Sequence, residues 1–140
     1  MAAMNMLNNE KTPEAESGSP RRRVLVLESD RLIRALIVEW LGMAETDALC
    51  VADVAGARTL AQRCDLVLAD VPAPHRAARR TVMQLAQALP HTPIIAMSAD
   101  ITACSQAARQ ALARELGASA VLVKPFNQHA LLSTIQNVRA

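Results

Sequence analysis

The stretch LVLAD, residues 66–70, ends a short apolar run at a single acidic residue, Asp70. Three further runs share this form, and they are LVLESD (25–30), IIAMSA (94–99) and VLVKPF (121–126), which stop at Glu28, Ser98 and Lys124. Apolar runs of this length, separated by helix-period segments, are typical of parallel strands that are buried on both faces. In such sheets ligands and chemistry gather at the carboxyl ends of the strands. We therefore expect two acids, a hydroxyl and a lysine to meet at one edge of a sheet.

The segments between these runs have the periodicity of helices. Strands are predicted at about 23–28, 47–52 and 65–70, then directly after Pro93, and at 119–123. Helices are predicted at about 31–43, 55–63 and 75–88, then from Asp100 to Gly117, and over a last segment with Leu131, Leu132, Ile135 and Val138. Five strands that alternate with five helices predict an α/β fold with a doubly wound, five-stranded parallel sheet.

Particular residues define the faces and ends of these helices. The helix at 31–43 has one wide apolar stripe at i, i+4 spacing, formed by Leu32, Ile33, Leu36, Ile37, Trp40 and Leu41. The helix at 75–88 has one apolar face, formed by Val82, Leu85, Ala86 and Leu89. Gly42 is expected to weaken or end the first helix, Asp100 to cap the start of the fourth, and Gly117 to cap its end.

Length and composition favour one small folded domain. A chain of 140 residues is long enough for a hydrophobic core and too short for two comfortable domains. About half of the residues are hydrophobic, yet there is only one Phe and one Trp, which predicts an aliphatic, alanine-rich core. Residues 1–21 are rich in Asn, Glu, Ser, Pro and Gly without periodicity, so we predict a disordered N-terminal tail followed by a domain at 22–140.

Charge, cysteine usage and hydropathy limit the partners and the location. The net charge of +2 is too small to imply a nucleic-acid partner, and the clustered arginines are expected on solvated surfaces, at positions 21–23, 76, 79 and 80. The cysteines have apolar neighbours and no CxxC spacing, which predicts reduced, buried thiols at Cys50, Cys64 and Cys104. There is no 18-residue apolar run and no leader pattern, so we expect a cytoplasmic protein without membrane insertion.

Taken in order, the motifs resemble those of the receiver domain of two-component response regulators. The resemblance covers about residues 22–139 and rests on VLVLESDRLIR, DLVLADVPAP, PIIAMSA and GASAVLVKPF. It implies a flavodoxin-like receiver fold of the (βα)5 type. It also implies a signalling module rather than an enzyme. Such a module takes a phosphoryl group from a histidine kinase or histidine phosphotransfer protein, and signals by docking to a downstream protein partner.

Carried over position by position, the resemblance gives each strand end a role. Asp70 matches the aspartate that accepts the phosphoryl group. Ser98 and Lys124 match the hydroxyl and the lysine that contact the phosphoryl oxygens, and the peptide bond between Lys124 and its proline is cis in the family. A divalent cation, Mg²⁺, would be held by Glu28, Asp70 and the backbone carbonyl of Pro72.

These residue types also suit phosphoryl transfer on physical grounds. The reaction needs positioning and neutralisation of the equatorial oxygens more than covalent chemistry from the protein. A carboxylate can be the nucleophile, and Mg²⁺ prefers hard oxygen ligands while it keeps several waters. Lys124 would supply a point charge, and Ser98 a hydroxyl donor that can move onto a new phosphate.

Two positions depart from the family pattern. The family usually has two adjacent acids after the first strand, whereas this chain reads Glu28-Ser29-Asp30. The second acid, the more direct cation ligand, falls on Ser29, which is a weak or absent ligand, and Asp30 begins a helix and compensates only in part. We therefore expect weak Mg²⁺ binding. Val121 stands where the family often has Tyr or Phe, and a valine has no ring that could swing inward as a readout.

Each of these residues also has an ordinary structural explanation. Asp70 could satisfy loop amides, Ser98 could belong to a turn or a cap, and Glu28 could simply be solvated. Lys-Pro is a common way to end a loop. The histidines show no metal-ligand spacing and lie far apart, at 75, 91 and 129.

Two functions from different classes therefore stay open. Retention of Asp70, Ser98 and Lys124 together favours a stand-alone receiver that is phosphorylated on Asp70. The change at Ser29 favours a phosphorylation-independent, receiver-like adaptor that uses the same faces constitutively. The sequence does not fit two enzyme classes. A dinucleotide-binding Rossmann domain needs a glycine-rich turn after the first strand, and this chain has none there. Aspartyl phosphatases that resemble haloacid dehalogenases normally have an acid two residues after the strand-end aspartate, and this chain has Pro72.

Overall fold

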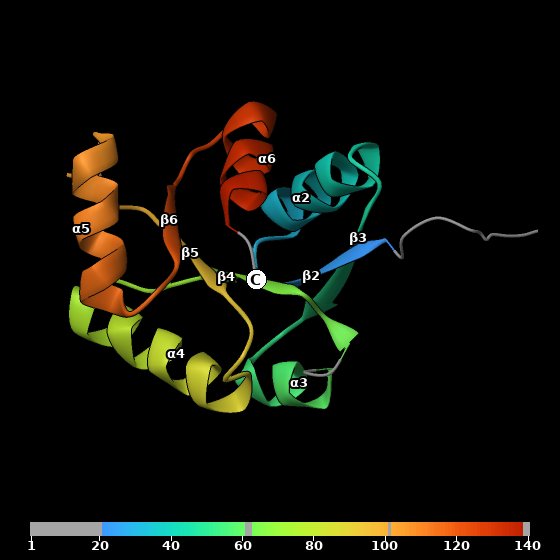
Figure 1. Cartoon of the computed structure of the whole chain (residues 1–140), viewed down its shortest axis with the longest axis horizontal. Helices are drawn as coiled ribbons and strands as arrows, with labels where there is room; N and C mark the ends of the chain where they lie inside the picture. Colours follow the sequence, from blue (N-terminus) through green and yellow to red (C-terminus); the bar gives the residue numbers. More distant parts are fainter. Residues whose placement is uncertain (1–20, 61–62, 101, 139–140) are drawn as a thin grey trace, which may run out of the picture.

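The computed structural model describes residues 21–60, 63–100 and 102–138. Within these ranges the strands are β2 (Arg22–Leu27), β3 (Thr46–Val51), β4 (Leu66–Asp70), β5 (Ile94–Ser98) and β6 (Ala120–Val123). The helices are α2 (Arg31–Met43), α3 (Val54–Thr59), α4 (His75–Ala88), α5 (Gln106–Leu116) and α6 (Gln128–Asn137). All strand pairs are parallel, which confirms the predicted α/β fold with a doubly wound sheet (Figure 1). Apart from Arg21, the predicted tail lies outside the described residues.

The strand order brings the four polar strand ends to one edge. The order is β3-β2-β4-β5-β6, so the winding of the chain reverses between β2 and β4, and ligands bind at such a switch point. Leu27 pairs with Ala69, so Glu28 and Asp70 are the next residues on neighbouring strands. Ser98 pairs with Val123 across β5 and β6, so Lys124 follows at the same edge.

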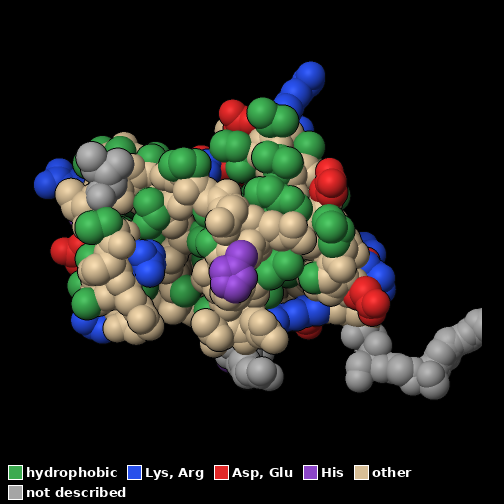
Figure 2. All heavy atoms as spheres, turned by 90° about the horizontal axis from the view of Figure 1, so that it is seen from above, with side chains coloured by type: hydrophobic (Ala, Val, Ile, Leu, Met, Phe, Trp, Pro, Cys, Tyr) green, Lys and Arg blue, Asp and Glu red, His purple; other side chains and the backbone are tan. Residues whose placement is uncertain are grey.

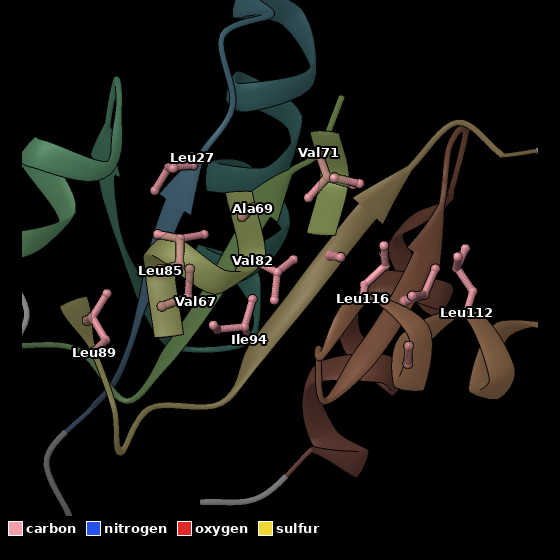
Figure 3. Close-up of a cluster of buried hydrophobic side chains, with 14 of the residues drawn as sticks. Leu27, Val67, Ala69, Val71, Val82, Leu85, Leu89, Ile94, Leu112 and Leu116 are labelled. Atoms are coloured by element: carbon pink, nitrogen blue, oxygen red, sulfur yellow. The ribbon is translucent and has the colours of Figure 1, made fainter. Parts of the chain in front are cut away.

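Helices cover both faces of the sheet. In Figure 1, α2 and α6 lie on one side of the sheet and α3 and α4 on the other, while α5 packs beside α4. Because successive side chains of a strand point to opposite faces, Val24 and Val26 pack against α2 and α6, whereas Leu25 and Leu27 pack toward α3, α4 and α5. Figure 3 shows strand and helix side chains meeting in this second cluster, among them Leu27, Val67, Ile94, Val82 and Leu85.

The core is aliphatic, as the composition predicted. The largest fully buried side chains are those of Leu, Ile, Val and Met. The two aromatic residues, Trp40 and Phe126, are only partly buried, and their rings meet edge to face with centroids 6.4 Å apart. They therefore stand at the margin of the α2–α6 cluster rather than at its centre.

Helix ends follow from capping side chains. Four helices, α2, α3, α5 and α6, begin at a side chain that accepts a hydrogen bond from a backbone N–H three residues later, namely Asp30, Asp53, Ser105 and Asn127. The predicted start of α5 after Asp100 is wrong, because Ser105 is the cap and the Asp100 carboxylate bonds within the preceding loop. The predicted end is confirmed: Gly117 has a φ of 81°, which favours glycine.

The core covers only part of the apolar stripe of α2. Ile37 and Leu41 are fully buried, but Leu32 is 70% exposed. The helix also runs one residue past Gly42. Five large hydrophobic side chains are exposed in the described part of the chain, and four lie on α2: Leu32, Leu36, Val38 and Met43. Figure 2, which looks onto the α2–α6 side, shows hydrophobic side chains across much of this surface. The fold thus leaves an apolar face of α2 uncovered.

Two predictions about burial are wrong. Cys50 and Cys104 are exposed, and only Cys64 is half-buried, so apolar neighbours in the sequence did not indicate burial. Ala86 is exposed on α4, because Val82 and Leu85 already form the face that meets the core. The arginines at 76, 79 and 80 are exposed, as expected. In the described ranges, no helix has both the length and the apolar character needed to cross a membrane.

Candidate functional site

Three of the four predicted side chains meet directly at the carboxyl edge of the sheet. The Lys124 Nζ atom donates a hydrogen bond to Asp70 Oδ1 at 2.8 Å. The same ammonium lies 2.6 Å from Glu28 Oε1. These contacts join the ends of β2, β4 and β6, so the expected convergence of these side chains is confirmed.

Glu28 is the buried member of this cluster. The residue is 3% exposed, and its Oε2 atom accepts a hydrogen bond from the backbone N–H of Asp30 at 3.0 Å. Its Oε1 atom has the short ion-pair contact with Lys124 but no hydrogen bond of good geometry among the described residues. A buried carboxylate is stable only with compensating charge. The lysine supplies that charge, and Oε1 keeps capacity for another partner.

Lys124 is held as a cation between the two carboxylates. Partial burial of its ammonium lowers its pKa, but the hydrogen bond to Asp70 and the close negative charges of Asp70 and Glu28 outweigh that effect, so the pKa of Lys124 is raised. Its backbone N–H donates to the carbonyl of Ser98 at 2.8 Å, and the Lys124–Pro125 peptide bond is cis.

Asp70 is the accessible acid of the site. Its side chain is 37% exposed, compared with 1% for Glu28. Lys124 occupies the Oδ1 atom, whereas Oδ2 accepts no hydrogen bond from the described residues. One carboxylate oxygen is thus held in place and the other is open to a reacting group.

Ser98 lies at this edge but does not bond to the acids. It is 8% exposed, and its Oγ atom accepts a hydrogen bond from the backbone N–H of Asp100 at 3.1 Å. Within the described ranges its hydroxyl makes no hydrogen bond to Asp70 or Lys124. A rotation of this side chain away from Asp100 would be needed to reach a group on Asp70.

The donor set fits a weakly held magnesium ion. Glu28 and Asp70 supply carboxylate oxygens, and the carbonyl of Pro72 accepts no hydrogen bond from the described residues. Mg²⁺ commonly binds through one or two carboxylates plus waters, so the buried, hydrogen-bond-free Oε1 of Glu28 suits it. Ser29 is exposed and brings no charge. The carboxylate of Asp30 instead caps α2 through the N–H of Ile33.

Charge explains why the binding would be weak. Two carboxylates and one ammonium leave the cluster with a net charge of −1, and an acid at position 29 would make it −2. Nowhere in the described part of the chain do three or more His, Cys, Asp or Glu side chains gather as metal ligands. Among the described residues, attraction to a dication at this edge therefore depends mainly on Glu28 and Asp70.

Sequence reasoning missed a second polar cluster next to the site. The Nε2 atom of His75 lies 2.8 Å from Asp100 Oδ2, and its Nδ1 atom lies 3.5 Å from Glu115 Oε1. The three residues come from α4, the loop after β5, and α5. No spacing in the sequence indicates this contact, because the partners are separated by 25 and 40 positions.

Val121 occupies the core without an aromatic ring. It is 5% exposed and pairs with Ala96 on the neighbouring strand. Its small side chain belongs to the cluster beneath α4 and α5. No bulky group at this position could exchange between an inward and an outward orientation.

Comparisons with known proteins agree with this fold. Residues 24–136 match the sequence family described as the response regulator receiver domain. The chemotaxis protein CheY4 of Vibrio cholerae is similar in structure, with 28% identity over 85% of this chain and 99% of that chain, and a TM-score of 0.64. No curated protein sequence matches the chain significantly.

Two more distant structures share the fold. The receiver domain of the sensor histidine kinase PA1611 from Pseudomonas aeruginosa, solved with a magnesium ion in its active site cleft, is 24% identical over 84% of this chain and 96% of that one, with a TM-score of 0.61. The receiver domain of Ssk1 from Saccharomyces cerevisiae, solved in complex with the histidine phosphotransfer protein Ypd1, is 20% identical over 86% and 90%, with a TM-score of 0.61.

Proposed function

This chain belongs to the family of response regulator receiver domains, and we propose that it accepts a phosphoryl group on Asp70 and signals by docking to another protein. The observation that carries the proposal is the state of the Asp70 carboxylate. Lys124 holds its Oδ1 atom at 2.8 Å, and its Oδ2 atom is open. A nucleophile for phosphoryl transfer needs this combination of fixed orientation and access.

The proposed reaction is an in-line displacement on phosphorus. Asp70 Oδ2 attacks the phosphorus of a phosphohistidine on the donor protein, and an O–P bond forms. The P–N bond breaks, its electron pair stays on the imidazole nitrogen, and that nitrogen takes up a proton. Lys124 neutralises charge on the transferred oxygens, and Ser98 donates its hydroxyl to one of them after it turns from Asp100. Bound Mg²⁺, held by Glu28, Asp70 and the Pro72 carbonyl, would add positive charge for the same oxygens.

The uncovered face of α2 supports a docking site for the phosphodonor. A groove of about 430 Å³ lies between α2 and the segment after β6, with Leu36, Trp40 and Phe126 among its lining residues. Lys124 lines the same groove, so a protein seated on it would lie beside Asp70. We assign this surface to a histidine kinase or histidine phosphotransfer protein. The yeast receiver solved with Ypd1 shows that a protein of this fold forms such a complex.

Phosphorylation can be tested with a small donor. Incubation with acetyl phosphate and Mg²⁺ should add one phosphoryl group, detected by intact-protein mass, and Asp70→Asn should abolish the gain. Asp47→Asn is the matched control, because the Asp47 side chain is about half exposed and pairs with Arg21 on the surface, away from the Lys124 cluster. Equal labelling of the Asp70→Asn variant would place the acceptor elsewhere and overturn the proposal.

Docking can be tested with the exposed hydrophobic residues. Leu32→Glu should slow transfer from a phosphohistidine protein by about tenfold, because interface anchors commonly contribute more than 1 kcal/mol. Labelling by acetyl phosphate should not change. Met83→Glu is the control, since Met83 is 50% exposed but lies on α4, away from the α2 surface. Equally slow phosphotransfer to both variants would contradict the assignment of the α2 surface as the docking site.

A phosphorylation-independent adaptor is the second candidate. Lys124 already pairs with both acids, and Ser29 adds no charge for a cation, which favours a site that stays unmodified. In that case the partner would bind wild type and Asp70→Asn equally well. The labelling and docking measurements together separate the two functions.

A further inference from the structure

Asp100 makes several of the hydrogen bonds in the loop that follows β5. Its backbone N–H donates to Ser98 Oγ at 3.1 Å, and its Oδ1 atom accepts from the N–H and the hydroxyl of Thr102 at 2.9 and 2.6 Å. The other carboxylate oxygen, Oδ2, lies 2.8 Å from His75 Nε2. A single residue thus connects Ser98 to the first residue of α4.

His75 extends this connection to α5. Its second ring nitrogen, Nδ1, lies 3.5 Å from Glu115 Oε1, so a carboxylate faces each nitrogen. Each carboxylate can accept a hydrogen bond from the ring nitrogen that it faces when that nitrogen carries a hydrogen. No other charged side chain in the described ranges has an ion pair or hydrogen bond with His75. Contacts therefore run from Ser98 through Asp100 and His75 to Glu115.

This series of contacts begins at the residue that must move. If Ser98 turns toward a phosphoryl group on Asp70, its hydrogen bond from the Asp100 N–H is lost or lengthened. Asp100 is then released on one side while His75 still holds it on the other. Val121 has no ring that could report the same event, so the charged contacts are the available route to the α4 and α5 surfaces.

We propose that His75 is a positioning residue: its contact with Asp100 holds the Ser98 loop in the unphosphorylated arrangement and carries the state of Asp70 to α5. This inference rests on the proposed function. Because His75 does not touch Asp70 or Lys124, it acts through Asp100 rather than on the reacting atoms. The depressed pKa of Asp100, about 2, agrees with a carboxylate that is held by Thr102 and His75.

The proposal predicts the direction of a measurable effect. Removal of the His75 contact should favour the arrangement in which Ser98 faces the phosphoryl group. His75→Gln should therefore bind beryllofluoride, a phosphoryl mimic, about two- to fivefold more tightly than wild type, as the strength of exposed ion pairs suggests.

Nuclear magnetic resonance of the whole chain tests this, with beryllofluoride and Mg²⁺ as the probe. In wild type the probe should shift the amides of Asp100 and of the α5 turn around Glu115. In His75→Gln the Asp100 shift should stay and the α5 shift should disappear. His91→Gln is the control, because His91 is exposed in the loop before β5, at the opposite edge of the sheet.

Wild-type affinity in His75→Gln with the α5 shifts intact would overturn the positioning role. A wild-type chain that does not respond to beryllofluoride at all would instead refute the proposed function. The contact is then judged on the unliganded chain, where His75→Gln must shift the Asp100 amide, and an unchanged amide position would refute the contact.

Discussion

Two clusters of paired charges lie near the carboxyl edge of the sheet, and they differ in how far water reaches them. In the first, Lys124 bridges Asp70 and Glu28, and the side chains of Lys124, Asp70 and Glu28 are 18%, 37% and 1% exposed. In the second, His75 contacts Asp100 and Glu115, and the side chains of His75, Asp100 and Glu115 are 55%, 19% and 66% exposed. Water and salt screen exposed pairs, whereas a buried pair is strongly coupled. The buried cluster therefore suits a fixed site, and the exposed one suits an adjustable contact.

The largest expected effect comes from breaking the buried cluster. Lys124→Met removes the cation and leaves Glu28 buried without compensating charge. We expect a loss of about 3 kcal/mol in the free energy of unfolding, because removal of one partner of a buried pair is strongly destabilising. Urea unfolding at pH 7 measures this. Arg31→Met, at an exposed position with no ion pair to any described residue, should stay within about 0.5 kcal/mol of wild type.

A smaller effect should follow from adding charge to the same cluster. Ser29→Asp changes its net charge from −1 to −2 and should tighten Mg²⁺ binding about 10- to 100-fold, or about 1.4 to 2.7 kcal/mol. It should also speed labelling of Asp70 by acetyl phosphate. Calorimetry gives the affinity and mass spectrometry the rate. If neither changes, Glu28 and Asp70 already bind the cation fully, and the argument from Ser29 is wrong.

Alkali should weaken the buried cluster. The pKa of Lys124 is raised in the folded chain above its ordinary value of 10.5. Its contribution to stability is therefore fully present below pH 10.5 and is lost as pH rises through the folded pKa. The difference in unfolding free energy between wild type and Lys124→Met should shrink in that range. A difference that stays constant up to pH 11 would mean that the charge of Lys124 does not stabilise the fold.

Acid should weaken the exposed cluster, and this is the smallest of the four effects predicted for the two clusters. Hydrogen bonds from Thr102 and His75 lower the pKa of Asp100 from 3.8 to about 2. The contribution is present above pH 3.8 and is lost as pH falls toward 2. The difference in unfolding free energy between wild type and Asp100→Asn, measured from pH 6 to pH 2, isolates the contribution of Asp100, since the other carboxylates titrate in both proteins. An unchanged difference across this range would show that the Asp100 contacts do not persist in solution.

The pattern of apolar strands in the sequence predicted much of the fold. Each of the four apolar runs became a buried strand, and each polar residue after it came to the same edge, as Glu28, Asp70 and Lys124 show. This works because a parallel sheet aligns the carboxyl ends of its strands whatever the details of side-chain packing. The start of the helix predicted at about 31–43 also followed from the sequence, because Asp30 caps it, but the helix ends one residue after Gly42, the residue expected to weaken or end it.

Other features followed from packing that no local pattern indicates. The two rows of the α2 stripe look alike in the sequence, yet Leu41 is buried and Leu32 is not, because α6 and the sheet reach only one of the rows. Asp100 has the residue type of a helix cap, but Ser105 caps α5 and Asp100 bonds to Thr102 and His75 instead.

The sequence by itself determined which chemical groups stand at the strand ends, that the core is aliphatic, and that position 29 lacks an acid. Those properties depend on residue type and on periods of two or 3.6 residues, which short windows contain. The tertiary structure alone decided that Lys124 occupies Oδ1 of Asp70 and leaves Oδ2 open, and that His75 faces Asp100. These contacts depend on distances of about 3 Å between segments far apart in the chain, and only the packing of helices on the sheet sets such distances.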